Sequence, residues 1–365
     1  MRIALLSYST KPRGGVVHTL ALAEALAALG EDVTVWTLGR GGDQAFFRPV
    51  DPAVHLSVVP LPDGPDGEGV GERILRSIST LRDAFASRAA EYDIVHAQDC
   101  ISANAVMPSG RCVRTVHHLD HFTTPELAAC HERAITDPYA HICVSAAVAA
   151  ELDEGWGIKA EVIPNGVAHE RFAAAAADKA GQDRWRERLG RYVLTVGGIE
   201  PRKGSIDLLE AFALLRERRP GHRLVIAGGE TLFDYRDYRA RWDERAAELG
   251  IEPAVLGPVP DDELPALVAA ADAFAFPSVK EGFGLAAMEA LAANVPLVVR
   301  DLPVLREVFG PAARFATTPA DLATELDHAL GAEDPARRLT GRQLAARHTW
   351  TAAARRHLDF YHSIS

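Results

Sequence analysis

Cysteine is scarce in this sequence, and the few cysteines are not spaced for metal binding or for a disulfide framework. Four occur among 365 residues, at Cys100, Cys112, Cys130 and Cys143, and no two of them form a Cys-x-x-Cys pair. Scattered cysteines of this kind are typical of reduced thiols. We therefore expect a protein of the cytoplasm, where thiols stay reduced.

Positive charge is also in deficit. Lysine and arginine total 39 against 50 aspartates and glutamates, which gives a formal net charge of -11. Negative charge repels phosphate backbones and anionic lipids, so the composition argues against a general nucleic-acid or membrane binder. Local basic patches are left open by this argument.

Long apolar runs are missing as well. No run reaches the roughly 20 residues that a helix needs to cross a bilayer, and no charged-then-apolar leader precedes the first strand pattern at Arg2 to Ser9. We expect no transmembrane segment. The helical pattern from Glu72 to Ala90 leaves peripheral membrane contact open, because arginines surround its apolar face, but packing of this helix on a sheet is the simpler interpretation.

The signatures of several ligand sites are absent. The sequence contains no Gly-x-Gly-x-x-Gly, no Gly-x-x-x-x-Gly-Lys-Ser/Thr, no Gly-x-Ser-x-Gly and no Asp-x-Asp. These absences argue against a dinucleotide fingerprint, a P-loop, a hydrolase triad and a metal-bridged diphosphate. We expect neither a cofactor nor a metal, so positive side chains would have to neutralise any bound diphosphate.

The sequence does contain a regular alternation of strand and helix patterns. Short apolar runs, typical of strands buried on both faces, alternate with helical segments over two stretches of about 150 residues each. This predicts an α/β fold of two facing, Rossmann-like, doubly wound parallel-sheet domains with a cleft between them. We place the domains at residues 1–172 and 173–344, with a linker in the alanine-rich and charged segment 169–190. A C-terminal helix at 345–365 is expected to pack back on the first domain.

The clearest candidate site lies between Phe274 and Arg300. An apolar strand breaks there at Pro277-Ser278, a loop carries Glu281, and an apolar helix follows that contains Glu289. A carboxylate in such a helix is costly to desolvate unless something donates hydrogen bonds to it, so Glu289 requires a partner. Both glutamates could line one crevice at the carboxyl end of the strand, where open parallel sheets bind ligands.

Two turns combine glycine with positive charge. In the turn from Gly197 to Gly204, adjacent Arg202 and Lys203 precede a helix, which suits a diphosphate and the charge it gains as a leaving group. The turn from Lys11 to Gly15 also leads into a helix and could hold an anion. That second signal is weaker, because many glycine pairs are only tight connections.

Histidines end one predicted strand of the first domain. His117 and His118 close the run VRTVHH, and His121 follows in the next loop. A histidine at the carboxyl end of a strand can contact sugar hydroxyls or exchange protons, and which of the first two points inward is open. With Asp120 the three histidines could instead hold a metal, although they lack the spacing usual for zinc. Asp99 ends a neighbouring strand and is a weaker candidate.

Four pieces of sequence carry a family resemblance. They are Gly14-Gly15 with His18, IPNGVAHERF (Ile163 to Phe172), VGGIEPRKG (Val196 to Gly204) and EGFGLAAME (Glu281 to Glu289). In these pieces and their order the chain resembles the retaining GT-B glycosyltransferases of family 4, which include sucrose synthase and bacterial mannosyltransferases. The last piece matches the Glu-x7-Glu element of that family. The resemblance implies transfer of a sugar from a nucleotide-diphosphate sugar with retention of anomeric configuration.

The resemblance also implies roles for single residues. Glu289 would hold the ribose hydroxyls and Glu281 the hydroxyls of the transferred sugar, while Arg202 and Lys203 would stabilise the departing diphosphate. His117 would approach the sugar from the first domain. Backbone positions of the donor site would be Gly15, Gly198, Gly282, Phe283, Gly284 and Leu285. Weaker candidates on the acceptor side are Gly14, His18, Asp99 and His118.

The chain departs from the family pattern in three places. Gly198 stands where relatives commonly have arginine, so Arg202 is expected to supply the guanidinium instead. Ala286 stands where relatives often have proline. Asn294 replaces a usual glycine, and asparagine tolerates the left-handed conformation that this turn would need.

Several questions stay open at the level of sequence. A non-catalytic module that keeps the GT-B scaffold and binds a nucleotide or glycan is the alternative to an enzyme. Nothing in the sequence separates a GDP from a UDP or ADP donor. The acceptor is unidentified, and the segments expected to select it, Pro62 to Gly71 and Leu119 to Pro125, have no composition that names a small molecule, a glycan or a lipid-linked acceptor.

Overall fold

The computed structural model describes residues 1–65, 67–120, 122, 124–229, 235–331 and 333–365. The chain folds into two compact units, of which unit 1 comprises Met1–Gly166 and Trp350–Ser365 and unit 2 comprises Val167–Thr349. A parallel β-sheet forms the centre of each unit, as predicted for an α/β fold. His121, one of the three histidines considered for a metal, lies outside the described residues.

Unit 1 contains a parallel sheet of seven strands in the order β3-β2-β1-β4-β5-β6-β7. Its strands are β1 (Arg2–Leu6), β2 (Asp32–Arg40), β3 (His55–Leu61), β4 (Ile94–Ala97), β5 (Cys112–Val116), β6 (Ala140–Cys143) and β7 (Glu161–Val162). Alternate residues of β1 face opposite sides, so that Ile3 and Leu5 enter one core while Ala4 and Leu6 enter the other. Burial on both faces explains why these strands are continuous apolar runs in the sequence.

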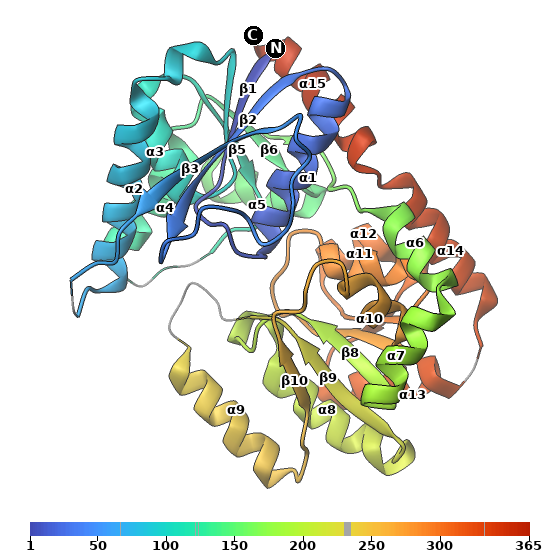
Figure 1. Cartoon of the computed structure of the whole chain (residues 1–365). Helices are drawn as coiled ribbons and strands as arrows, with labels where there is room; N and C mark the ends of the chain where they lie inside the picture. The colour runs from blue at the N-terminus through green and yellow to red at the C-terminus, as the bar shows by residue number, and fades with distance from the viewer. Residues whose placement is uncertain (66, 121, 123, 230–234, 332) are drawn as a thin grey trace. The chain divides into compact units, whose positions relative to one another are not determined.

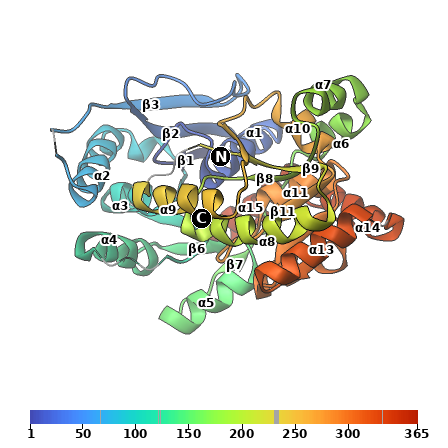
Figure 2. The same cartoon turned by 90° about the horizontal axis from the view of Figure 1, so that it is seen from below.

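Helices cover both faces of this sheet. They are α1 (Gly14–Ala28), α2 (Val70–Ala86), α3 (Cys100–Val106), α4 (Pro125–Thr136), α5 (Ala146–Trp156) and α15 (Trp350–Ile364). Figures 1 and 2 both show α2, α3 and α4 side by side on one face, and α1 packs with α15 on the other. Helix α2 buries Ile74, Leu81 and Phe85 in this core, which accounts for its amphipathic pattern by packing on the sheet.

The C-terminal helix α15 completes the core of unit 1. Tyr361 is fully buried there, and Trp350, Leu358 and Phe360 pack against the same cluster. The Tyr361 hydroxyl lies 2.6 Å from His96 Nδ1 on β4. The last residues of the chain are therefore an integral part of the unit that begins at its N-terminus.

Unit 2 contains a parallel sheet of six strands in the order β10-β9-β8-β11-β12-β13. Its strands are β8 (Arg191–Val196), β9 (His222–Ala227), β10 (Ala254–Gly257), β11 (Ala273–Phe276), β12 (Leu297–Arg300) and β13 (Arg314–Ala316). Its helices are α6 (His169–Ala177), α7 (Lys179–Leu189), α8 (Ser205–Arg218), α9 (Arg236–Glu248), α10 (Leu264–Ala270), α11 (Leu285–Ala292), α12 (Pro303–Phe309), α13 (Pro319–Gly331) and α14 (Pro335–Arg347).

The segment predicted as a linker is helical, so that expectation is wrong. Residues 169–190 form α6 and α7, which pack against α10 within unit 2. The alanine run is a strong helix former, and Phe172 and Trp185 are buried on the packed side. Unit 2 begins at Val167, N-terminal to the boundary expected near residue 172.

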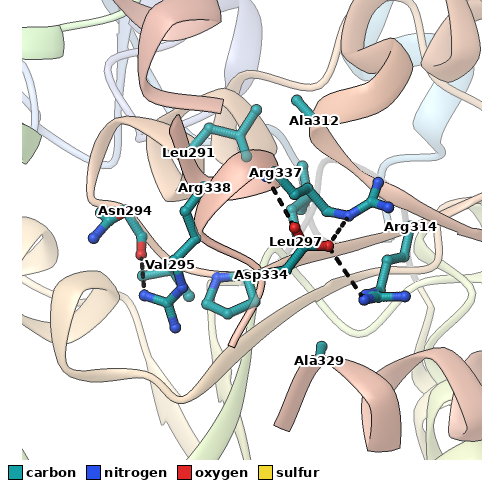
Figure 3. Close-up of a pocket in the computed structure, with 11 residues that line it drawn as sticks. Leu291, Asn294, Val295, Leu297, Ala312, Arg314, Ala329, Asp334, Arg337 and Arg338 are labelled. Atoms are coloured by element: carbon teal, nitrogen blue, oxygen red, sulfur yellow. Dashed lines mark hydrogen bonds and ion pairs between the residues drawn. The ribbon is translucent and has the colours of Figure 1, made fainter. Parts of the chain in front are cut away.

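A small hollow at the end of α11 shows how the chain turns into β12 (Figure 3). Asn294 has a φ of 60°, which confirms that asparagine takes the left-handed position at this turn. Arg338 Nη1 donates to the Asn294 carbonyl oxygen at 3.0 Å, and nearby Arg337 and Arg314 pair with Asp334 at 3.0 and 3.5 Å. The Arg338 contact ties α14 to the turn that follows α11, the helix that carries Glu289.

No helix in the described ranges is both long and apolar enough to cross a bilayer.

Candidate functional site

The candidate site of unit 2 lies where the strand order reverses. Strand β8 is central, with β9 on one side and β11 on the other, and Leu194 of β8 is in register with Phe274 of β11. The turns that follow these two strands, 197–204 and 277–284, therefore emerge next to each other at the carboxyl edge of the sheet. Open α/β sheets bind ligands at such a switch point.

Three of the predicted residues meet at this edge. Lys203 Nζ donates to Glu281 Oε1 at 2.6 Å, and Arg202 Nη1 donates to the same oxygen at 3.1 Å. Arg202 also pairs with Glu200 at 3.1 Å, a buried carboxylate that sequence reasoning missed. Two cations and two carboxylates balance within this cluster, so an anionic ligand would compete with Glu281 for both cations.

Glycines allow the two turns to approach each other. Gly204 has a φ of +63°, and a Cβ there would lie 2.3 Å from the carbonyl oxygen of Pro277. Behind the first turn, a Cβ on Gly228 would lie 2.8 Å from the nitrogen of Gly198. Larger residues would therefore separate the turn that carries Arg202 and Lys203 from its neighbours.

The N-terminus of α11 presents backbone donors beside these side chains. The loop before α11 is buried at Gly282, Phe283 and Gly284. Gly284 has a φ of +98°, and a Cβ added there would lie 3.1 Å from the Phe309 ring. Within the described chain no acceptor pairs with the N–H groups of Phe283, Gly284 and Leu285. Unpaired amides at a helix start favour an anion.

Glu289 lies on α11 as a half-buried carboxyl group. It has no hydrogen-bond or ion-pair partner among the residues that the structure describes. Burial raises the pKa of Glu289 to about 8, while the charge of Arg171 lowers it and the charge of Asp261 raises it. Arg171 is itself paired with Asp261 at 2.9 Å. The partner that the sequence requires for Glu289 is therefore not supplied by unit 2 in the described part of the chain.

The corresponding edge of unit 1 brings Gly15, His18 and His117 together. The His117 ring lies 3.9 Å from the position of a Cβ on Gly15, and its centroid is 4.7 Å from that of His18. His117 Nε2 is 3.2 Å from Gln98 Oε1. Burial, followed by the charge of Arg114, lowers the pKa of His117 well below its usual value, so this imidazole is neutral at pH 7.

Two of the weaker candidates have structural partners. His18 is 1% exposed and its Nδ1 lies 2.9 Å from Asn165 Oδ1, which joins the first and second sequence pieces of the family resemblance. Asp99 accepts hydrogen bonds from the N–H groups of Ser102 and Tyr8 at 2.8 and 3.0 Å and caps α3. These contacts account for Asp99 and for Nδ1 of His18, whereas His18 Nε2 is buried and has no hydrogen-bond partner in the described structure.

His118 pairs with a neighbouring acid in the same loop. Its Nε2 forms an ion pair with Asp120 at 3.1 Å, and both side chains are about one-third exposed. Gly14 is exposed at the start of α1. No group of three or more histidine, cysteine or acidic side chains in the described ranges is placed to hold a metal ion.

Known protein families and proteins match this chain along most of its length. Residues 182–342 match the model of "Glycosyl transferases group 1", and residues 12–171 match the model of "Glycosyltransferase Family 4". A D-inositol 3-phosphate glycosyltransferase of Salinispora arenicola is 31% identical over 344 residues, which cover 81% of this chain and 76% of that protein. The chain belongs to the glycosyl transferases group 1 family. It is a glycosyltransferase.

Other members of the glycosyl transferases group 1 family are similar along most of the chain. The MMP alpha-(1->4)-mannosyltransferase of Mycolicibacterium hassiacum is 29% identical over 386 residues, covering 91% of this chain and 89% of that protein. A glycogen synthase of Mycobacterium tuberculosis is 28% identical over 360 residues, covering 88% and 84% of the two chains. These relatives agree in the class of enzyme and differ in acceptor.

Solved structures confirm the fold of this glycosyltransferase. Anabaena Alr3699/HepE, crystallised with UDP and glucose, superposes with a TM-score of 0.77 at 19% identity, covering 100% of this chain and 99% of that one. Sucrose-phosphate synthase from Thermosynechococcus elongatus superposes with a TM-score of 0.78 at 20% identity, covering 100% and 98%. The predicted GT-B class of two Rossmann-like parallel-sheet domains is therefore correct.

Proposed function

We propose that this glycosyltransferase moves a sugar from a nucleotide-diphosphate sugar to an acceptor hydroxyl, with retention of anomeric configuration and without a metal ion. The observation that carries the proposal is the convergence of Arg202 and Lys203 on Glu281 at the switch point of unit 2. The nucleotide sugar is supported by relatives, since HepE was crystallised with UDP-glucose.

The donor is held in this proposal by the two ends of the Glu-x7-Glu element. Glu289 accepts hydrogen bonds from the ribose hydroxyls, which supplies the partner that its carboxylate otherwise lacks. Glu281 accepts from hydroxyls of the transferred sugar. The diphosphate lies against Arg202, Lys203 and the amides of residues 283–285, with Gly198 and Gly282 leaving room for its approach.

Bond breaking then depends on the two cations. The bond between the anomeric carbon and the diphosphate oxygen breaks, and Lys203 and Arg202 stabilise the negative charge that develops on that oxygen. The acceptor oxygen attacks from the same face and its proton passes to the departing diphosphate. No protein nucleophile is required, and the two cations take the place that a metal ion has in other sugar transferases.

Unit 1 contributes the remaining residues of the proposal. Neutral His117 forms a hydrogen bond with a hydroxyl of the transferred sugar, while Gly15 leaves room for the phosphate or the acceptor. Gln98 orients His117 through the contact at Nε2. His18 contacts Asn165, and Asp99 accepts from backbone amides. We therefore assign both residues a structural role at this edge of the sheet.

The test is a panel of nucleotide sugars, namely UDP-glucose, GDP-mannose and ADP-glucose, with release of free nucleotide diphosphate as the measurement. D-inositol 3-phosphate and glycogen, which appear in the names of relatives, are included as acceptors. We expect one donor to turn over and Lys203→Ala to reduce kcat more than KM. Lys179→Ala, at an exposed lysine of α7, is the matched control. A folded protein that binds no donor and turns over none would overturn the proposal in favour of a non-catalytic binding module.

A further inference from the structure

Four arginines gather at one corner of unit 1, and we call them the arginine cluster. Arg13 follows β1, Arg40 ends β2, and Arg73 and Arg76 lie in the first turns of α2. They are close enough for their charges to act on one another. Burial lowers the pKa of Arg40, and the positive charges of Arg73, Arg13 and Arg76 lower it further, against an opposing effect of Tyr8.

Two members of the arginine cluster have only neutral hydrogen-bond partners. Arg40 Nη2 donates to Ser77 Oγ at 3.1 Å, and Arg13 Nη1 donates to the Tyr8 hydroxyl at 2.8 Å. The Nε atoms of both arginines are buried and have no acceptor in the described structure. Removing a guanidinium group from water without a carboxylate partner costs free energy. A bound anion beside these two side chains would offset that cost.

Two acids near the arginine cluster, Glu68 and Asp99, are engaged with partners other than Arg13 and Arg40. Glu68 binds Arg76 through both of its oxygens, at 2.6 and 2.7 Å, so it neutralises one member of the cluster. Asp99 accepts from the N–H groups of Ser102 and Tyr8. Neither carboxylate is within salt-bridge distance of Arg13 or Arg40. The missing acceptor is therefore not found among the described residues of unit 1.

Stacking on Tyr8 does not satisfy these groups. Arg13 lies over the Tyr8 ring at 5.5 Å, which covers a face of the guanidinium but leaves the N–H donors in its plane unpaired. The Tyr8 hydroxyl, which accepts from Arg13, has no acceptor of its own in the described chain, and burial raises its pKa so that it stays protonated. Helix α1 begins directly after Arg13 without a side-chain cap, which adds a positive helix end.

We propose that Arg13, Arg40 and the Tyr8 hydroxyl bind a phosphate group carried by the acceptor, so that the acceptor of this enzyme is a phosphorylated polyol. The inference rests on the proposed function for the identity of the ligand as acceptor. An arginine presents two parallel donors to a phosphate, and two arginines with a hydroxyl satisfy three of its oxygens. The phosphate can belong to a soluble sugar or cyclitol or to a lipid headgroup, and transfer to soluble acceptors or to vesicles distinguishes these two sources.

The first experiment measures binding without catalysis. Inorganic phosphate is titrated into the whole protein at low ionic strength by calorimetry, with wild type, Arg40→Gln and Arg13→Gln. We expect each variant to weaken phosphate binding about tenfold or more, because each removes a charged donor. Arg82→Gln is the matched control, since Arg82 lies on the exposed side of α2 beside Asp83. Arg40→Lys keeps the charge without the fork and should recover binding only in part, which guards against a variant that fails to fold.

The second experiment measures transfer. Glucose 6-phosphate, D-inositol 3-phosphate and their unphosphorylated forms are compared as acceptors, beside vesicles that contain phosphatidylinositol. We expect the phosphorylated forms to exceed the neutral ones in kcat/KM by about tenfold or more, and Arg40→Gln to remove that preference while donor hydrolysis without acceptor stays within about twofold. A response to vesicles alone assigns the phosphate to a lipid headgroup, and a response to soluble acceptors assigns it to a free polyol.

The outcomes separate this inference from the donor assignment. If phosphate binding depends on Arg40 but no nucleotide sugar turns over, the proposed function fails while the phosphate site stands. If a donor turns over but phosphorylated and neutral acceptors are used equally, or if Arg40→Gln binds phosphate as wild type does, the inference is overturned.

Discussion

Replacement of Glu289 by glutamine should stabilise the protein and weaken donor binding at the same time. In the structure this carboxyl group is half-buried on an apolar helix and has no donor within the described residues. Glutamine has the same shape and does not ionise. The substitution therefore removes the ability of the side chain to ionise and leaves its packing in place.

The magnitude follows from the pKa of Glu289, which is raised from 4.5 to about 8. Below pH 4.5 the carboxyl group is protonated in both the folded and the unfolded chain, and its ionisation does not affect stability. Between these two values the unfolded chain ionises while the folded protein retains the proton, so stability falls with rising pH by about 1.4 kcal/mol per unit. At pH 7, which lies above 4.5 but below the raised pKa, the accumulated loss of stability is about 3 kcal/mol. Because the side chain keeps some contact with water, we expect glutamine to recover about 1–2 kcal/mol.

The assay is thermal unfolding of both proteins between about pH 4 and 8.5, with and without the nucleoside diphosphate of the donor. For a unit of this size a gain of about 1–2 kcal/mol raises Tm by roughly 2–8 °C. The gain should be small near pH 4 and should grow up to about pH 8. Affinity for the donor should fall about tenfold to a hundredfold, because hydrogen bonds from ribose to a carboxylate are lost. Glu252→Gln, at an exposed glutamate of unit 2, is the control and should change neither quantity.

Two results would refute this reasoning. A variant that unfolds at or below the wild-type temperature at about pH 8 would show that Glu289 is stabilised by a partner in the folded protein. A gain of equal size at both ends of the pH range would show that the effect comes from packing and not from ionisation.

Three further predictions concern other parts of the molecule. The pKa of His357 is lowered from 6.5 to about 4 by burial. Between these values the unfolded chain protonates this imidazole and the folded protein does not, so the free energy of unfolding is unaffected above pH 6.5 and falls as the pH drops toward 4. That loss is at most about 2 kcal/mol at pH 5, and His357→Gln should flatten the pH dependence measured by urea unfolding. Asn294→Val should destabilise by about 1–2 kcal/mol because of its φ of 60°, whereas Asn294→Gly should be close to neutral by the same denaturation curves. Tyr361→Phe should destabilise unit 1 by about 1–3 kcal/mol, because His96 Nδ1 loses the hydroxyl that pairs with that nitrogen, and removal of α15 altogether should leave unit 1 unfolded by circular dichroism.

Most of the fold was predictable from the sequence because its strands are buried on both faces. The apolar strand that the sequence predicts before Pro277-Ser278 is β11. The sequence placed Glu281 and the pair Arg202 and Lys203 in turns after strands, where ligands bind. Their meeting depends on the order of β8 and β11 in the sheet, which the structure supplies.

Contacts that depend on distant segments could not be predicted. Gln98 contacts His117 only because β4 and β5 are adjacent, and a glutamine after a strand has no signal of its own. The linker interpretation of residues 169–190 failed because a charged surface helix and a flexible connection have similar compositions. Arg13 and Arg40 come together from the ends of two strands, and neither lies in a motif.

The path of the chain has a consequence for biosynthesis. Val167 and Thr349, the first and last residues of unit 2, pair with each other as a parallel bridge, and the Val167 N–H donates to the His348 carbonyl oxygen at 2.7 Å. Unit 2 is thus an insertion whose two ends are fastened together, and α15 emerges from the ribosome only after the whole insertion. At a translation rate of about 5–20 residues per second, the apolar face that α15 covers stays uncovered for roughly 10–40 s. A chaperone that acts on this enzyme during translation would therefore find its binding surface on the α1 side of unit 1.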